Sequence, residues 1–490
     1  MKYLPFQHGG IEHIRFRQAT YLADQMGLGK TIQACGVINR CPDIIRVLVI
    51  CPASVKLNWQ RELETWCPWV IVGQAMPKQW PDTPVVIINF DILHRYPDEL
   101  RAYPWDLVVI DEAHKLVNLE ARRTVAVVGD GRTAPIPARR KLAMSGTPMV
   151  NRPRELFPML HWLDPVEFPS YHAFGERYCG GEGQVIIQQF GYSAESRRSN
   201  YAKFKQWAQE VGHDGKPKLS TTEWFDFEAR YRPARLRSRM IDDYRGSSNL
   251  EELRDRILGG LMLRRMKKDV LTQLPPKRRQ VIELDPSAKL RRLLNKEMAL
   301  WDKLQLGPDQ AMEVGFRHGI LDQEDSVEAE WEEISTLRSE AAQLKVPMTI
   351  EYLKDAVASS GKVVCFVHHK DTVSKIVQEF PRCSFIDGSV SQANRQVAVD
   401  RFQNDPSVGL FIGTSAAAEG ITLTASSHVV IAEWFWGPGI LSQMEDRCHR
   451  IGSEGHDSIL VQYLLLQDSM DIRMAQTVIR KQMLEDRLLN

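Results

Sequence analysis

Short apolar runs rich in β-branched residues recur in the first and last parts of the chain, separated by longer stretches that mix polar and apolar residues. The runs in the first part are Tyr21–Ala23, Arg46–Cys51, Val85–Asn89, Asp106–Asp111 and Lys141–Ser145, and those in the last part are Lys362–Val367, Cys383–Ile386, Val408–Gly413, His428–Ala432 and Ile459–Leu465. Runs that are apolar throughout are typical of strands covered on both faces, as in parallel α/β sheets. The pattern therefore predicts an α/β fold with two lobes, formed by residues 1–165 and 275–490.

The middle of the chain departs from this pattern. Residues 166–260 are rich in aromatic residues, glycine and arginine and show no regular rhythm of strands. Residues 287–350 are predicted to be helical, because apolar side chains recur there at helical spacing: Leu290, Leu293, Leu294, Met298 and Trp301. Gly307–Pro308 interrupts that spacing. A final amphipathic helix is predicted from Met470 to Leu489.

Composition limits the class of protein. Of the 490 residues, 43% are hydrophobic and 26% are charged, which is typical of globular proteins and excludes a collagen, a disordered chain and a small disulfide scaffold. No apolar run approaches the roughly 18 residues that a membrane span needs, and the first ten residues lack the pattern of a signal peptide. We therefore expect a soluble, intracellular protein without membrane contacts. None of the 8 cysteines forms a Cys-x-x-Cys pair, so we expect buried, reduced thiols.

Charge is distributed unevenly, although the net charge is only +1. Residues 230–300 contain 19 Lys/Arg against 9 Asp/Glu, whereas residues 309–340 contain 10 Asp/Glu against 2 Lys/Arg. Such segregation can give a nearly neutral protein a basic face for nucleic acid, but it equally fits two solvated helical surfaces. Charge alone leaves both interpretations open.

A glycine-containing loop, Asp24-Gln25-Met26-Gly27-Leu28-Gly29-Lys30-Thr31, follows the first predicted strand and opens a helix. Gly27 and Gly29 allow backbone N–H groups to turn toward phosphate oxygens, and the helix N-terminus adds its dipole. Lys30 can reach the β- and γ-phosphates of a nucleotide, and the Thr31 hydroxyl can ligate Mg²⁺. Because the strict pattern has glycine where this chain has Asp24, the loop taken alone also fits a chance turn.

An acidic pair follows the predicted strand that ends at Ile110. Asp111 and Glu112 stand at its carboxyl end, where parallel α/β sheets place their ligands, and His114 follows two residues later. Asp111 is expected to hold Mg²⁺ through water, Glu112 to orient and deprotonate an attacking water, and His114 to couple the state of the nucleotide to the other lobe. The two sites together predict a nucleotide hydrolase rather than a chance turn.

An ordered series of motifs across nearly the whole chain resembles the Swi/Snf-type DNA-dependent ATPases of helicase superfamily two, with the loop at Asp24–Thr31 and motif II at Asp111–His114. The other matching segments are Pro5–Gln7 (the adenine-reading Q motif), Cys51–Ser54 with Asn58, Trp59 and Glu62 (motif Ia), Ser145–Pro148 (motif III), Val363–His368 (motif IV), Gly413–Thr414 with Glu419–Thr424 (motif V) and Gln443–Gly452 (motif VI). The phosphate loop has the family's own form, Asp24 included.

A narrower resemblance links the chain to the annealing-helicase, or HepA-related (HARP-like), branch. It rests on Phe174–Cys179, Asp243–Leu250, Leu263–Arg265, Asp269–Leu271, Leu274–Lys277 and Thr422. The chain departs from the branch in beginning almost at the Q motif, so we expect the accessory N-terminal modules to be missing. It also departs at Gly437 and Ser453, and in an apparent insertion near residues 182–240.

The resemblance implies an α/β fold with two RecA-like P-loop lobes built on parallel sheets, with helical protrusions and a C-terminal helix. It implies an N-terminal ATP-binding lobe at 1–165 and a helical protrusion with the inter-lobe linker at 166–274. The C-terminal helicase lobe would be 275–490, with a helical segment near 287–350.

The resemblance also implies that ATP and Mg²⁺ bind between the lobes. The residues it places at the nucleotide are Gln7, Asp24, Gly27, Leu28, Gly29, Lys30, Thr31 and Gly420, with Thr31 and Asp111 on Mg²⁺ and Glu112, Lys30, Gln443, Arg447 and Arg450 in catalysis. Arg447 and Arg450 would come from the far lobe and complete the site only when the lobes close. In other nucleotide hydrolases such an arginine is worth about 10³–10⁵ in rate.

A motor of this kind is expected to hold duplex or forked DNA through its phosphates. The candidate contacts are Ser54, Lys56, Asn58, Thr414, Ser415 and Trp436, for each of which capping or core packing is an equal alternative. The Arg/Lys-rich stretch Leu263–Lys268 is either a brace at the hinge or a solvated helix face. The insertion, with Arg230, Arg232, Arg235, Arg237 and Arg239 among aromatic residues, is expected to contact DNA or a protein partner. Its alternative is a small satellite core.

Three functions fit these motifs. The first is an ATP-driven double-stranded DNA translocase that remodels DNA or displaces bound protein. The second is a strand-separating DNA or RNA helicase, which is disfavoured because Swi/Snf motors usually lack an unwinding pin. The third is a nucleotide-sensing binding module, which the complete set Lys30, Glu112, Arg447 and Arg450 disfavours. We expect a monomer that acts on DNA in a bacterial or phage-infected cytoplasm, or in the nucleus of a eukaryote.

Overall fold

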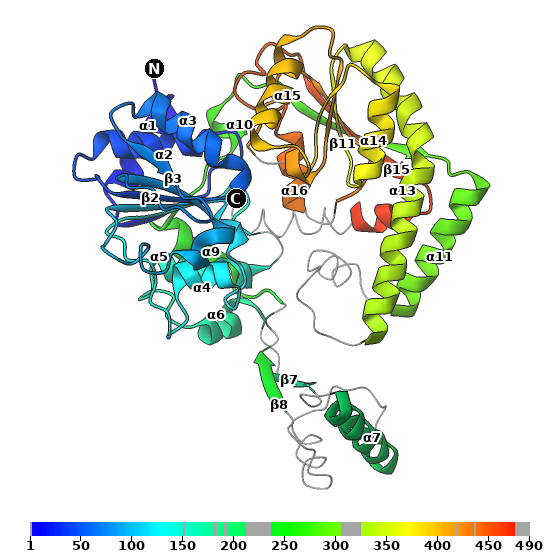
Figure 1. Cartoon of the computed structure of the whole chain (residues 1–490), viewed down its shortest axis with the longest axis horizontal. Helices are drawn as coiled ribbons and strands as arrows, with labels where there is room; N and C mark the ends of the chain where they lie inside the picture. Colours follow the sequence, from blue (N-terminus) through cyan, green and yellow to red (C-terminus); the bar gives the residue numbers. More distant parts are fainter. Residues whose placement is uncertain are drawn as a thin grey trace.

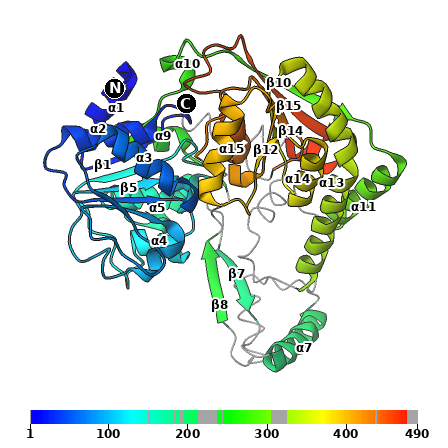
Figure 2. The ribbon, with the colours of Figure 1, turned by 45° about the horizontal axis from the view of Figure 1, so that its top comes forward.

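The computed structural model describes residues 2–149, 152–180, 184–189, 194–211, 237–242, 244, 246–304, 325–417, 420–435 and 438–475. Two parallel sheets, each flanked by helices, form two lobes that lie side by side, and a hairpin with one helix projects away from both (Figures 1 and 2). The predicted α/β fold with two parallel-sheet lobes is confirmed.

The first lobe is built on a seven-stranded parallel sheet in the order β3-β4-β2-β5-β6-β1-β9. Its strands are β1 (Ala19–Leu22), β2 (Val47–Cys51), β3 (Val72–Gln74), β4 (Val85–Asn89), β5 (Leu107–Asp111), β6 (Lys141–Met144) and β9 (Met262–Leu263). The helices of this lobe are α1 (Pro5–Arg15), α2 (Lys30–Arg40), α3 (Lys56–Trp66), α4 (Arg122–Val128) and α5 (Phe157–Leu163).

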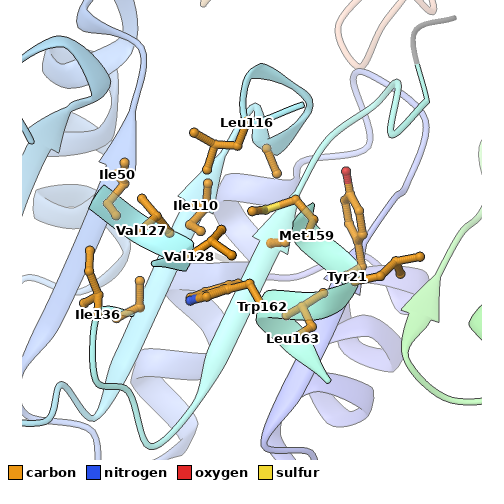
Figure 3. Close-up of a cluster of buried hydrophobic side chains, with 14 of the residues drawn as sticks. Tyr21, Ile50, Ile110, Leu116, Val127, Val128, Ile136, Met159, Trp162 and Leu163 are labelled. Carbon is orange, nitrogen blue, oxygen red and sulfur yellow. The ribbon is translucent and has the colours of Figure 1, made fainter. Parts of the chain in front are cut away.

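The apolar strands of this sheet are covered on both faces by separate hydrophobic cores. Along β5, Val108 and Ile110 belong to one buried cluster, and Leu107 and Val109 belong to the other. Successive side chains of a strand point to opposite faces, so a strand with a core on each side is apolar throughout. Figure 3 shows part of the first cluster, where Ile110 from the sheet lies in the same packed group as Trp162 from α5.

The second lobe has a six-stranded parallel sheet in the order β10-β15-β14-β11-β13-β12. Its strands are β10 (Lys277–Leu284), β11 (Val363–Phe366), β12 (Ser384–Ile386), β13 (Leu410–Gly413), β14 (His428–Ile431) and β15 (Ile459–Leu466). The associated helices are α11 (Ala288–Leu304), α13 (Asp325–Ser360), α14 (Lys370–Glu379), α15 (Gln392–Asn404) and α16 (Pro438–Glu445). Val364 and Phe366 face one core and Val363 and Cys365 face another, as in the first lobe.

All ten predicted strands are present, but three further strands of these sheets were not predicted. β3 and β9 are only three and two residues long. β10 begins Lys277-Arg278-Arg279-Gln280, and most of it is exposed, because it lies at the edge of its sheet and only one neighbour, β15, covers it. A pattern of continuous apolar residues cannot identify such edge strands, since they need no core on both faces.

The predicted helices within 287–350 are confirmed as α11 and α13, while the break at Gly307–Pro308 falls outside the described residues. The predicted C-terminal helix is observed only at 470–475, since the described part of the chain ends there. All eight cysteines are free and buried, as predicted. Across the described ranges, no helix combines the length and apolar character that crossing a bilayer requires.

The segment between the lobes contains α6 (Tyr171–Tyr178), α9 (Leu250–Leu258) and an antiparallel pair of strands that was not predicted. These strands are β7 (Gln184–Gln189) and β8 (Arg237–Asp242), and between them lies α7 (Ala194–Val211). Phe204 and Trp207 of α7 are buried and stacked, with ring centroids 5.9 Å apart. For Trp207, this packing supports the satellite-core alternative. Arg230, Arg232 and Arg235 lie outside the described residues.

The linker returns to the first lobe before it enters the second. The β1–β9 pairing continues beyond the end of β1 through two backbone hydrogen bonds. Ala23 N donates to Leu263 O at 2.8 Å, and Gln25 N donates to Arg265 O at 3.0 Å. Arg265 also forms an ion pair with the fully buried carboxylate of Asp24, which accepts a second hydrogen bond from Gln33 Nε2 at 2.9 Å. Leu263–Lys268 is therefore a brace against the phosphate loop rather than a solvated helix face.

We expect Arg265→Met to lower the stability of the first lobe by about 3–5 kcal/mol, because it leaves the Asp24 carboxylate buried without its cation. A loss of that size lowers the melting temperature by at least about 6 °C. Arg139→Met is the control, since Arg139 pairs with Asp106 on the surface with 62% of its side chain exposed. That variant should melt close to wild type, and equal losses in the two variants would contradict the expectation.

Candidate nucleotide-hydrolysis site

The phosphate loop has the backbone shape that the sequence predicted. Gly27 and Gly29 have φ angles of 85° and 70°, a left-handed conformation that glycine adopts without strain, and α2 begins at the next residue, Lys30. The space above Gly27 is also filled from the second lobe and from the linker: a Cβ atom at this position would lie 3.1 Å from Arg450 Cβ and 3.1 Å from Lys267 Cε. The loop therefore requires Gly27 for its conformation and for the close approach of the other lobe.

Two glutamines hold the same carbonyl of the loop. Gln7 Nε2 donates to Leu28 O at 3.4 Å, and Gln33 Nε2 reaches the same oxygen at 3.4 Å. The other end of the Gln7 side chain accepts the backbone N–H of Leu4 at 2.9 Å. The predicted nucleotide residues Gln7, Leu28 and Gly29 thus lie together, since a Cβ atom at Gly29 would be 2.6 Å from Gln7 Nε2.

The side chains of Lys30 and Asp24 have different partners, so the two residues have different roles in the loop. Lys30 Nζ donates to Asp24 O at 2.9 Å, and burial lowers the pKa of Lys30, although the charges of Glu112, Asp24 and Asp111 oppose this shift. The Asp24 side chain instead points into the protein, where Arg265 and Gln33 occupy both its oxygens. Asp24 thus supports the loop from inside the protein. Because both carboxylate oxygens are already bonded, the geometry does not favour a nucleotide contact through the Asp24 side chain.

The acidic pair lies at the end of β5, where the sequence predicted it. Trp59 Nε1 donates to Asp111 Oδ2 at 2.8 Å, and the Glu112 backbone N–H donates to Asp111 Oδ1 at 3.0 Å. Glu112 has a left-handed backbone with φ 52°, which is uncommon for a residue with a side chain and is frequent at functional sites. Glu112 Oε2 lies 3.2 Å from His114 Nδ1, which is also 3.0 Å from Ser145 Oγ of motif III.

The two carboxyl groups have opposite pKa shifts. Burial and the neighbouring charge of Glu112 raise the pKa of Asp111 to about 6. Burial also disfavours the charged form of Glu112, but His114, Lys30 and the far-lobe Arg447 more than compensate and lower its pKa to about 2. Glu112 is thus held as a carboxylate.

These residues fit a bound Mg²⁺ ion. Two adjacent buried carboxyl groups repel each other, as the raised pKa of Asp111 indicates, and a hard cation would relieve that repulsion. Thr31, in the first turn of α2, would add a hydroxyl oxygen. Among the described residues, no group of three or more His, Cys, Asp or Glu side chains is placed to hold a metal. Mg²⁺ is commonly held in this way, by one or two protein oxygens together with water and substrate phosphates.

The two arginines of motif VI converge on one carbonyl of motif V. Arg447 Nη1 and Arg450 Nη1 donate to Ile421 O at 3.1 and 2.9 Å, and Arg447 Nε donates to Gln443 O at 3.0 Å. Burial and the charge of Arg447 lower the pKa of Arg450 to about 10. Their charges act on carboxyl groups of the first lobe: Arg447 helps to lower the pKa of Glu112, and the charge of Arg450 opposes the raised pKa of Glu62.

Other motifs also meet across the lobes. A Cβ atom at Gly420 of motif V would lie 2.5 Å from Val55, and one at Gly439 of α16 would lie 3.5 Å from Thr147 of motif III. Together with the approach of Arg450 to Gly27, these contacts place the predicted residues of both lobes around one site.

A second, shallow cleft adjoins this site and contains some of the predicted DNA contacts. Ser54 and Asn58 line it from the first lobe, and Gly420 lines it from the second; the other lining residues are Leu57, Arg61, Arg395, Gln396 and Ile421. Arg61 and Arg395 were not predicted. Arg61 lies between Trp59 and Glu62 of motif Ia but is not one of its matching residues, and Arg395 lies in none of the motifs, so the resemblance did not identify either of them.

The structure does not bring every predicted DNA contact to this cleft. Lys56 is only 6% exposed, and its ammonium group donates to Ala75 O at 2.6 Å, so the contact predicted for it is not supported. Its apolar stem and its position one residue into α3 place it against the core. Thr414 is also buried, whereas Ser415 is exposed at the start of a short 3-10 helix (Ser415–Ala417). Trp436 lies outside the described residues.

Fold and site together define a two-lobed P-loop nucleotide hydrolase. The family model of the SNF2-related domain matches residues 16–322, and that of the helicase conserved C-terminal domain matches residues 345–452. The chain therefore belongs to the SNF2-related family of DNA-dependent ATPases, as the motifs predicted.

The relatives of the chain include the predicted annealing-helicase branch. The human DNA annealing helicase and endonuclease ZRANB3 is 30% identical over 100% of this chain and 40% of its own length. The bovine SWI/SNF-related matrix-associated actin-dependent regulator of chromatin subfamily A-like protein 1 is 30% identical over 96% of this chain and 43% of its own length. The chain thus spans about two fifths of these relatives.

Among solved structures, the SWI2/SNF2 ATPase core of Sulfolobus solfataricus in complex with dsDNA aligns with 99% of this chain and 92% of that chain. Its sequence identity is 19% and the TM-score is 0.41, too low to establish a shared arrangement of the lobes.

We expect Lys30→Ala to weaken ATP binding, because the ammonium group would neutralise phosphate charge, and Glu112→Gln to retain binding but lose turnover, because the amide cannot accept a proton from water. ATP affinity and kcat should be measured separately for each variant. Wild-type kcat in the Glu112→Gln protein would show that Glu112 is not the base.

We expect Arg447→Ala and Arg450→Ala each to reduce kcat by about 10³-fold or more. The residues that are expected to bind the nucleotide lie mainly in the first lobe, so ATP affinity should change little. Equilibrium binding of a fluorescent ATP analogue and DNA-stimulated turnover separate the two effects. A variant that keeps full DNA-stimulated turnover would exclude its arginine from the reaction.

Proposed function

We propose that the chain is an ATP-driven double-stranded DNA translocase that remodels DNA structures or displaces DNA-bound protein. The observation that carries this proposal is the position of Ile421. Its carbonyl oxygen accepts hydrogen bonds from both Arg447 and Arg450, and the same residue lines the cleft that contains Ser54 and Asn58. A movement of the arginines on hydrolysis would therefore displace Ile421 and change the shape of the cleft.

The mechanism follows from the division of the site between lobes. The first lobe supplies the phosphate loop, Asp111 and Glu112, and the second supplies Arg447 and Arg450, so hydrolysis requires both lobes together. Bound Mg²⁺ would neutralise charge on the β- and γ-phosphates, held near Thr31 and Asp111. Glu112 would accept a proton from the attacking water, and the arginines would stabilise charge on the phosphoryl group as it transfers.

Loss of the γ-phosphate removes the anion that the arginines face, which favours separation of the lobes. If Ser54 and Asn58 hold a DNA phosphate on one side of the cleft and Gln396 holds another across it, opening and closing of the lobes changes the distance between these two contacts. Repeated cycles then move the duplex along the cleft. Phosphate contacts suit this task, because they are independent of base sequence.

Two alternatives remain open to test. A strand-separating helicase would use the same lobes, and a nucleotide-sensing module would bind ATP without turnover. The human relative ZRANB3 is named a DNA annealing helicase and endonuclease, and we propose only the ATP-driven motor for the part of it that this chain shares. We also propose that the protein acts as a monomer in the compartment that contains its DNA, the bacterial cytoplasm or the eukaryotic nucleus. The 182–240 insertion is proposed to contact DNA or a protein partner.

We expect duplex DNA to stimulate ATP hydrolysis, and we expect the stimulation to fall steeply with salt. A site that neutralises Z phosphates loses affinity with a slope of about −0.9 Z in a double-logarithmic plot. ATP turnover should be compared with duplex, single-stranded and forked DNA and with RNA from 50 to 200 mM salt. Equal turnover with and without DNA at low salt would contradict a DNA motor.

Displacement assays then separate the functions. A translocase should displace a triplex-forming strand from a duplex without separating the duplex itself. Release of the duplex strands from a tailed substrate would instead favour the helicase, and ATP binding without turnover would favour the sensor. Arg61→Ala, on the cleft wall, should weaken DNA-stimulated turnover, whereas Arg139→Ala on the surface of the first lobe should not.

A further inference from the structure

The linker between the lobes carries a residue that contacts both halves of the hydrolysis site. Lys267 begins α10 (Lys267–Val270) and lies near the end of the brace Leu263–Lys268 that runs beside the phosphate loop. Its backbone N–H donates to the side-chain oxygen of Gln25 in that loop at 2.7 Å. Lys267 is therefore fixed to the first lobe through its main chain.

The side chain of Lys267 reaches the second lobe. Its Nζ atom lies 3.0 Å from Asp446 Oδ2 and donates to His449 O at 2.5 Å. These two residues belong to the turn after α16 that also carries Arg447 and Arg450. The side chains of Lys267 and Asp446 are only 4% and 3% exposed, so solvent does not screen the pair.

The same side chain lies beside the phosphate loop. A Cβ atom built on Gly27 would be 3.1 Å from Lys267 Cε, 3.3 Å from Lys267 Nζ and 3.1 Å from Arg450 Cβ. Lys267 and Arg450 therefore approach the loop at the same point. We propose that Lys267 is a positioning residue that holds the arginine-bearing turn of the second lobe against the phosphate loop of the first, so that both arginines are oriented for hydrolysis.

Neutralisation of Asp446 alone does not account for Lys267. Lys277 of β10 already pairs with Asp446, with its Nζ atom 2.7 Å from Oδ1, and belongs to the sheet of the second lobe. Burial lowers the pKa of Lys267 to about 8, with Lys277 and Arg450 contributing through their positive charges and Asp446 opposing them. Burying this second ammonium group beside Asp446 has a cost in free energy, and a contact that joins the two lobes gives that cost a function.

Lys267→Met tests this proposal, which rests on the proposed function of the arginines. The variant should fold, because Asp446 retains Lys277 as a partner. We expect kcat of the DNA-stimulated ATPase to fall about 10–100-fold, since small misplacements of a catalytic group have effects of that size. ATP affinity should change little. Lys268→Met is the matched control: this neighbouring lysine is exposed, and its loss should leave kcat and ATP affinity at wild-type values.

A purely structural role is distinguished by combining variants. If Lys267 acts through the arginine-bearing turn, Lys267→Met should reduce turnover much less in an Arg450→Ala background than in the wild-type background. A residue that only stabilises the fold would reduce turnover by the same factor in both. Equal factors, or a kcat within twofold of wild type in the single variant, would overturn the proposal.

Two further measurements separate the possible failures. A melting curve shows whether Lys267→Met is folded; if it is not, Lys267→Gln, which retains a donor for the His449 carbonyl, takes its place under the same criteria. Normal turnover in Arg450→Ala alone would contradict the proposed function of that arginine. Reduced turnover in Arg450→Ala with normal turnover in Lys267→Met would contradict only the positioning role.

Discussion

The ion pair between Asp24 and Arg265 is the interaction on which the rest of the arrangement depends. It joins residues 241 positions apart and so closes a long loop of the chain, which includes the projecting hairpin. The entropy cost of closing a loop grows only with the logarithm of its length, so a long insertion is tolerated if the closing contact is strong. A buried carboxylate with both oxygens bonded supplies such a contact. It fixes the start of the phosphate loop and the path of the linker at once.

Electrostatics then make the two lobes interdependent. The first lobe presents two adjacent carboxyl groups, where burial and the charge of Glu112 raise the pKa of Asp111. The second presents two neighbouring guanidinium groups, where burial and the charge of Arg447 lower the pKa of Arg450. Neither arrangement is favourable by itself. A bound phosphate chain with Mg²⁺ would place positive charge near Asp111 and negative charge near the arginines. Such a nucleotide would complement both lobes only when they are together, which gives the proposed ATP-dependent closure a physical reason.

The sequence predicted the parts of the fold and site that repeat a strong local pattern. Nine of the ten predicted strands have a core on both faces, and the tenth, β12, was recognised at a sheet edge although Phe385 is exposed. The roles of Lys30, Asp111 and Glu112 could be predicted because the loop and the strand end in recognisable chemistry. The edge strand β10 was not predicted, because its polar and exposed residues form no apolar run that distinguishes it from a surface loop. Asp24 and Arg265 lie in recognised motifs and Lys267 lies in the Arg/Lys-rich stretch Leu263–Lys268. Their partners were not predictable, because contacts between residues so far apart in the sequence leave no trace in local spacing.

Charge gave the least reliable guide, and the structure explains why. The basic segment 230–300 suggested a surface for DNA or a solvated face, but several of its described cations are used inside the protein. Arg265 pairs with Asp24, Lys267 and Lys277 pair with Asp446, and Arg279 pairs with Glu445. Lys56 likewise donates to a carbonyl in the first lobe. Cations held in this way cannot release counterions on binding DNA. The proposed grip on DNA would then depend on an exposed cation that lines the cleft, Arg61, together with uncharged donors such as Ser54 and Asn58.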